Sequence, residues 1–221
     1  GKQVSVLVEL KARFDEENNI VWAKMLEKAG CHVIYGLVGL KTHSKITLVV
    51  RREEDGIRRY VHLGTGNYND ATAKLYTDLG LLTCNEAIGE DATAVFNMLS
   101  GYSEPLGWNH LALAPLWLKD KFLYLISREK ENALNGRPAR IVAKMNSLCD
   151  QDIIQALYEA AAAGADDPQR GDPQAKQRCM RYRFKDPAGA AEKAGKCHGC
   201  APLFELLLAD TNHHFGKICT C

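Results

Sequence analysis

The order of apolar segments at the beginning of the chain constrains its fold most strongly. Residues 5–10 form a short apolar run that is typical of a buried strand. A helical pattern follows from about Asp15, and its apolar residues share one stripe: Trp22, Met25, Leu26 and Ala29. Residues 32–35 predict a second strand. Two strands joined through a helix pair in parallel with a right-handed crossover, so the sequence predicts an α/β fold.

Further elements follow the same logic. Strands are predicted over residues 44–50 and 57–63. The charged turn between them is short, so this pair should be antiparallel. A glycine-rich loop over residues 64–67 interrupts the pattern. Beyond it the sequence predicts helices over residues 91–100, 116–135 and 150–163, and a strand over residues 140–144.

Composition narrows the class of protein. Lys plus Arg is 28 and Asp plus Glu is 27, a net charge of +1, which disfavours a globally basic nucleic-acid binder. No apolar run reaches the roughly 20 residues that a membrane span needs. Isolated cysteines up to Gly164 are typical of a cytosolic protein. Because the chain begins at Gly1, directly before a predicted core strand, we expect it to be part of a longer protein.

The chain divides into three compositional parts. We expect one domain over residues 1–110 and the start of a second, similar unit over residues 111–164. Residues 165–221 form a tail that begins with a polar stretch rich in Asp, Pro and Gly. The tail also holds candidate zinc ligands, namely Cys197, Cys200, His213, His214, Cys219 and Cys221. We favour the alternative that these cysteines are accidental and form no site.

The segment Lys41-Thr-His-Ser-Lys45 is the first candidate for chemistry. Side chains of a strand repeat every two residues, so His43, Lys45 and Thr47 are predicted to share a polar face. A lysine offers positive charge to phosphate oxygens, and a histidine can attack phosphorus or act as a general acid or base. The alternative is a solvated strand end without function.

The segment His62-Leu-Gly-Thr-Gly-Asn67 is the second. His62 ends its predicted strand, and the glycine-rich turn after it can bring backbone N–H groups close to an anion. The alternative is an ordinary β-turn. The two histidines lie on neighbouring, antiparallel strands in this interpretation. The pattern resembles that of the phospholipase D superfamily, whose usual Asp a few residues after the lysine is replaced here by Val50.

A narrower resemblance rests on longer segments. Residues 9–17, 39–45, 62–69 and 76–78 resemble consecutive signature segments of bacterial polyphosphate kinase, the ATP-dependent type with a phosphohistidine intermediate; residues 144–148 also fit. The resemblance covers residues 1–164 in order. It implies a phospholipase-D-like mixed sheet with flanking helices, followed by a truncated second α/β unit.

The resemblance implies roles for four residues. His43 matches the histidine that takes the γ-phosphate of ATP, and His62 matches a second essential histidine. Tyr76 matches a residue that contacts the nucleotide. Arg13 matches an arginine near phosphate and Mg²⁺; a guanidinium has no lone pair to give a metal, so we expect it to contact phosphate oxygens instead.

Two further site residues are predicted without the family resemblance. Lys45 follows from strand geometry, as a positive charge on the face of the first histidine. Asn67 follows from loop chemistry, as a side-chain donor beside the glycine-rich turn.

The resemblance also implies the partners. It predicts a transferase that binds ATP or ADP, Mg²⁺ and polyphosphate, but no nucleic acid. It further predicts a phosphoprotein intermediate, a homo-oligomer of the full-length protein, and a cytoplasmic location, with membrane association as part of a complex as the alternative. Two other functions stay open, a phosphodiesterase of the same fold and an inactive remnant with a zinc-binding tail.

Overall fold

A computed structural model describes residues 1–10, 16–37, 39–76, 78–101, 103–141, 143, 148–165, 203–204 and 206–208. These residues fall into two compact units, which begin at Gly1 and at Ala112. Several predicted features lie outside the described residues: the helix start at Asp15, Arg13, and every candidate zinc ligand of the tail. Within the described ranges, no helix is both long and apolar enough to cross a bilayer.

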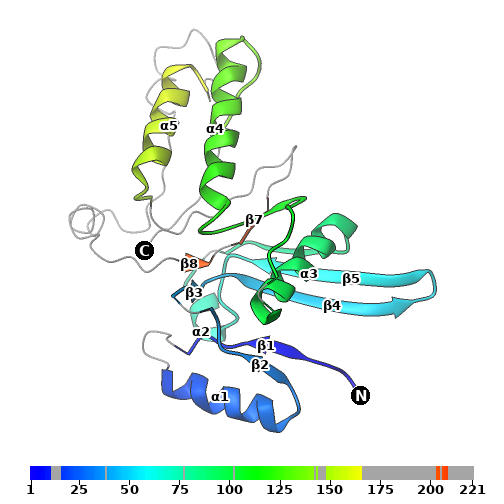
Figure 1. The fold of residues 1–221 in the computed structure, drawn as a ribbon. Helices are drawn as coiled ribbons and strands as arrows, with labels where there is room; N and C mark the ends of the chain where they lie inside the picture. The colour runs from blue at the N-terminus through cyan, green and yellow to red at the C-terminus, as the bar shows by residue number, and fades with distance from the viewer. Residues whose placement is uncertain are drawn as a thin grey trace. The chain divides into compact units, whose positions relative to one another are not determined.

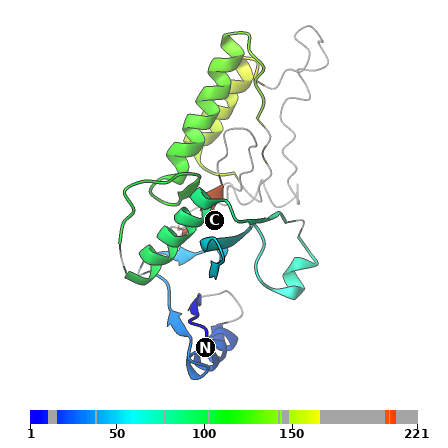
Figure 2. The same ribbon diagram turned by 90° about the vertical axis from the view of Figure 1, so that its right-hand side faces the viewer.

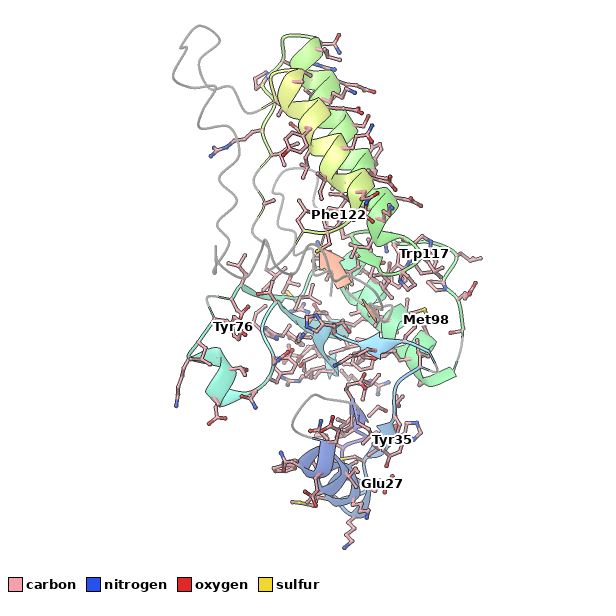
Figure 3. The ribbon with its side chains drawn as sticks, turned by 90° about the vertical axis from the view of Figure 1, so that its left-hand side faces the viewer. Glu27, Tyr35, Tyr76, Met98, Trp117 and Phe122 are labelled. Carbon is pink, nitrogen blue, oxygen red and sulfur yellow. The ribbon has the colours of Figure 1, made fainter. Side chains whose placement is uncertain are left out.

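The first unit opens with the predicted strand, helix and strand. These are β1 (Ser5–Leu7), α1 (Glu16–Lys28) and β2 (His32–Ile34), and the two strands pair in parallel, as predicted. Two acidic residues in the first turn of α1 and Lys28 in the last complement the helix dipole. Tyr35 Oη donates to Glu27 Oε1 on α1, and this hydrogen bond raises the pKa of Tyr35 (Figure 3).

The prediction that the apolar stripe of α1 forms its buried face is wrong. Ala23 is the buried residue of this helix, only 2% exposed, whereas Trp22 and Met25 are 52% and 51% exposed. The physical reason is the size of the neighbouring sheet. A sheet of two short strands covers only a narrow strip of a helix, and α1 presents a small side chain to it.

A three-stranded antiparallel sheet forms the centre of the first unit. Its strands are β4 (Lys45–Glu53), β5 (Gly56–Gly64) and β6 (Gly80–Thr83), in that order, which confirms the predicted antiparallel pair. The sequence did not predict β6, because four residues are too few to show a period. A short strand, β3 (Lys41–Thr42), precedes β4 and pairs with β8 (Leu203–Phe204); the short helix α2 (Asp70–Ala73) follows β5.

Helix α3 (Glu86–Gly101) covers one face of this sheet (Figure 1, Figure 2). Its inward residues Ala92 and Val95 are fully buried. A Cβ atom at Gly89 would lie 2.8 Å from Arg59 Cβ, so the glycine lets the helix approach β5 closely. Residues alternate along a strand, and the opposite face of β5 therefore carries Tyr60 and His62.

A buried carboxylate connects α3 to the chain that follows it. Asp91 is only 3% exposed. Its oxygens accept hydrogen bonds from the backbone N–H groups of Asn109, His110 and Leu111 at 3.0, 2.7 and 2.8 Å. Bonds to an ionised acceptor are stronger than neutral ones. Asp91 thus fixes the entry into β7 (Leu111–Leu113).

The second unit is built on two packed helices, α4 (Leu118–Leu134) and α5 (Gln151–Ala162), which confirm the predicted ones to within two residues (Figure 1). Their shared core contains Ile126, Ala133, Ile153, Leu157 and Ala160. Lys119 bridges to Asp150 and Asp152, and Lys130 to Glu159. In this unit, β7 pairs with β9 (Leu206–Leu208).

The strand predicted over residues 140–144 is wrong for its described residues, 140, 141 and 143, which belong to no strand. The backbone N–H of Arg140 donates to Glu129 Oε2 on α4 at 3.0 Å. Ile141 packs against the core of α4 and α5. The Glu129 side chain thus satisfies the backbone N–H that a neighbouring strand would otherwise bind, and the α4–α5 pair partly buries the apolar side chain of Ile141.

We predict that Asp91→Ala lowers the free energy of unfolding by about 3 kcal/mol or more, because buried N–H groups lose their acceptor and each costs about 1–3 kcal/mol. Urea unfolding followed by circular dichroism measures the loss. Glu90→Ala is the matched control, since that carboxylate makes one long contact of 3.4 Å with Asn109 Nδ2. Equal losses in the two variants would contradict the role of Asp91.

Acid should weaken the α4–α5 pair through Asp150. Partial burial raises the pKa of Asp150, but the hydrogen bond from Ile153 N–H and the Lys119 ammonium outweigh this and hold the pKa below its ordinary 3.8. The stabilisation is therefore complete above that value and is lost as the pH falls through the lower pKa of the folded state.

Two substitutions of the capping residue Asp150 separate the contribution of its hydrogen bond from that of its charge. Asp150→Asn keeps a capping oxygen and removes the titrating carboxylate. Thermal melting should therefore show that this variant loses less stability on acidification than the wild type does. Asp150→Ala loses the cap as well and should cost about 1 kcal/mol at neutral pH. Asp152→Ala, in an exposed pair, is the control. An unchanged acid dependence in Asp150→Asn would contradict the account.

Candidate functional site

The two predicted motifs meet at one end of the β4–β5 hairpin. Lys45, the first residue of β4, pairs with Gly64, the last residue of β5, and Thr47 pairs with His62. Directly opposed residues of an antiparallel pair project to the same face. Lys45, Thr47 and His62 therefore lie on the face opposite the one that α3 covers.

His43 itself does not belong to a strand. Residues 43 and 44 separate β3 from β4, so the prediction that strand alternation orients His43 is wrong. The backbone is fixed in another way. Glu9 Oε2 accepts from the N–H of Thr42 at 2.8 Å, and Lys45 Nζ donates to the carbonyl oxygen of His43. The Glu9 carboxylate thus holds the backbone just before the half-buried His43, and the Lys45 ammonium holds the backbone carbonyl of His43 itself.

His62 has a defined environment. Its Nδ1 is hydrogen-bonded to Tyr68 Oη at 2.7 Å, and Thr47 Oγ1 donates to the same hydroxyl at 3.0 Å. A Cβ atom at Gly64 would lie 3.2 Å from His62 Cε1, and one at Gly80 would lie 3.1 Å from Nε2. The imidazole therefore packs directly on the backbone of two glycines.

The glycine-rich loop after His62 is tied to the segment before β6. Thr65 Oγ1 donates to Asp78 Oδ1 at 2.8 Å and accepts from Leu79 N–H at 2.9 Å. A Cβ atom at Gly66 would lie 2.3 Å from Asp78 Oδ2. The space beside Gly66 is thus filled by the Asp78 carboxylate. Its negative charge makes the backbone at Gly66 an unfavourable place for a bound anion.

The remaining predicted residues lie beyond this loop. The Asn67 side chain is exposed, and the backbone carbonyl oxygen of Asn67 accepts from the backbone N–H of Asn69 at 2.8 Å. Asn69 caps α2 by accepting from Thr72 N–H. Tyr76 follows α2 and is 53% exposed (Figure 3). Arg13 lies outside the described residues.

Sequence reasoning missed several residues of this site. It gave no role to Tyr68, which lies within the segment 62–69, and none to Thr47, although it placed Thr47 on the polar face. It left Asp78 open, and it did not single out Glu9. In the part of the chain that the structure describes, no group of three or more His, Cys, Asp or Glu residues could hold a metal ion.

The contact between Gly66 and Asp78 can be tested by a double mutant. Gly66→Ala should lower the free energy of unfolding by about 1–3 kcal/mol, because the new methyl group overlaps the carboxylate. Asp78→Ala removes the two closest atoms, at 2.3 and 2.6 Å, so the double variant should lose less than the sum of the single losses. Urea unfolding of all four proteins gives the coupling energy, and strict additivity would contradict the contact.

Comparisons with known proteins identify the family of most of the chain. The family model described as polyphosphate kinase C-terminal domain 1 matches residues 1–105, and that described as polyphosphate kinase C-terminal domain 2 matches residues 111–166. The polyphosphate kinase of Halalkalibacterium halodurans is 66% identical over 164 residues, which are 74% of this chain. That of Thermosynechococcus vestitus is 60% identical over 166 residues, 75% of this chain.

A solved structure agrees with the sequence comparisons. The crystal structure of the polyphosphate kinase from Porphyromonas gingivalis matches with a TM-score of 0.65 and 39% identity, over 75% of this chain and 28% of that one. This likeness is consistent with the predicted phospholipase-D-like α/β fold. The chain spans 23% of the length of the two curated relatives. Over residues 1–166, the chain belongs to the polyphosphate kinase family.

Proposed function

We propose that this chain carries the phosphoryl-transfer centre of an ATP:polyphosphate phosphotransferase, as an incomplete copy of the longer family protein. The observation that supports this most strongly is local. Lys45 hydrogen-bonds the backbone of His43 and pairs across the hairpin with Gly64, against which His62 packs. Both histidine motifs of a family whose relatives are named polyphosphate kinase thus belong to one end of one hairpin.

The proposed reaction has two steps. A ring nitrogen of His43 attacks the γ-phosphorus of ATP, a P–N bond forms, and the P–O bond to ADP breaks, so that ADP leaves with the electron pair. A terminal oxygen of polyphosphate then attacks the same phosphorus, and the P–N bond breaks. A P–N bond is close enough in energy to the anhydride bond of ATP for the reaction to run in both directions.

Positive charge is the main requirement of such a transfer. We assign Lys45 to the oxygens of the transferred group. Arg13 would contact phosphate oxygens near Mg²⁺ without ligating the metal. Mg²⁺ in proteins commonly keeps waters and binds through substrate phosphates with one or two carboxylates, so we propose that it arrives with ATP. His62 is proposed as the second histidine of the centre.

The nucleotide and the domains complete the proposal. The exposed ring of Tyr76 would contact the nucleotide, and Asn67 would donate to it or to phosphate. Residues 1–110 would form the catalytic domain and residues 111–164 the start of a second one. We also propose a cytoplasmic location and, for the full-length protein, a homo-oligomer.

The proposal predicts a phosphoenzyme. Incubation of this chain with γ-³²P-ATP and Mg²⁺ should give a phosphoryl group that is labile in acid and stable in alkali, because it is bound through nitrogen. His43→Ala should abolish the label, and Lys45→Ala should slow labelling by about tenfold or more, because it removes a charge-assisted contact worth about 1.5–3 kcal/mol. His32→Ala, which removes an exposed histidine of β2, is the matched control.

Two outcomes would contradict the proposal. A full label in His43→Ala would exclude this histidine as the nucleophile. Absence of label in the wild-type chain, while the full-length relative from Halalkalibacterium halodurans is labelled under the same conditions, would show that this chain has no competent centre.

A further inference from the structure

The hydrogen bonds around His62 bear on which of its two ring nitrogens carries the proton, as well as on where the ring lies. Tyr68 Oη lies 2.7 Å from His62 Nδ1 and 3.0 Å from Thr47 Oγ1, so one hydroxyl group with a single hydrogen makes both hydrogen bonds. A phenolic hydroxyl can donate once and accept as well. The direction of these two bonds therefore decides which nitrogen of His62 carries the proton in the neutral ring.

Elementary acidity favours one direction. A phenol is a better hydrogen-bond donor than an aliphatic hydroxyl, and an imidazole nitrogen is a better acceptor than a hydroxyl oxygen. The strongest donor pairs with the strongest acceptor when Tyr68 donates to His62 Nδ1 and accepts from Thr47.

Packing limits the alternatives open to the ring. Cε1 and Nε2 of His62 lie against Gly64 and Gly80, where added Cβ atoms would approach to 3.2 and 3.1 Å. The Tyr68 ring lies beside the imidazole, with centroids 5.5 Å apart and planes tilted by 42°. The two glycines and Tyr68 therefore hold the ring on two sides, with Nδ1 at the tyrosine hydroxyl.

We propose that Tyr68 is a positioning residue that fixes the neutral imidazole of His62 in the Nε2–H tautomer. The nitrogen that bears the proton is set by the hydrogen bond that the other nitrogen makes. An Nδ1 that accepts from Tyr68 leaves Nε2 as a donor.

One consequence rests on the proposed function. His62 then meets a phosphoryl oxygen as a hydrogen-bond donor through Nε2–H and does not compete with His43 as a nucleophile at that nitrogen. This divides the work of the two histidines, since His43 would form the P–N bond and His62 would stabilise charge on the group in transfer.

The tautomer can be measured without any activity. We would record ¹⁵N–¹H correlation spectra of the full chain, labelled at histidine, at about pH 9, where an ordinary histidine with a pKa of about 6.5 is neutral. His62 should show an acceptor-type Nδ1 and a protonated Nε2 in a single form. Its signals are assigned by their loss in His62→Gln. Tyr68→Phe keeps the ring but removes the hydroxyl, and the single form should give way to a mixture of both tautomers.

Tyr60→Phe is the matched control. Tyr60 lies on β5, the strand that carries His62, but its hydroxyl donates to Glu53 Oε1 at 3.0 Å and not to the histidine. This variant should leave the His62 signals unchanged. A protonated Nδ1 in the wild-type chain would overturn the proposal by itself, even if Tyr68→Phe failed to fold. A single Nε2–H form that persists in Tyr68→Phe would overturn it as well. The proposed function depends on labelling of His43, so the two can fail separately.

Discussion

The antiparallel pairing of β4 with β5 is the constraint on which the candidate site depends. Its register runs from Lys45 opposite Gly64 to Glu53 opposite Gly56. A shift by one residue would turn every side chain to the other face and move His62 away from Thr47 and toward the side that α3 covers. Val61 is only 1% exposed, and Arg59 packs against Gly89 of α3. These contacts therefore help to fix the face of the sheet on which the histidine chemistry is proposed to occur.

Glycines on this face serve close packing more than flexibility. Gly64 and Gly80 make room for the His62 ring, and Gly66 makes room for the Asp78 carboxylate. A larger side chain at Gly64 or Gly80 would displace the His62 ring, and one at Gly66 would displace the Asp78 carboxylate. The segment 62–66 thus combines a histidine with the space that the histidine and its neighbours need.

Sequence reasoning succeeded where the signal was local and regular. The parallel β1–β2 pair, the β4–β5 hairpin, and helices α4 and α5 followed from periodicity and connection length. It failed where tertiary context decided: the buried face of α1 follows the small sheet beside it, and the backbone at Arg140 is satisfied by Glu129. It also placed Lys45 and His62 in one neighbourhood but could not foresee Tyr68, because a contact across a loop depends on where that loop folds back.

The central claim is that the two histidines of this hairpin have different tasks. Peptide mapping by mass spectrometry under alkaline conditions, after brief exposure of the chain to ATP and Mg²⁺, tests it most directly. The account predicts a phosphoryl group on the peptide that contains His43 and none on the peptide that contains His62. A phosphoryl group on His62, with His43 unmodified, would contradict it.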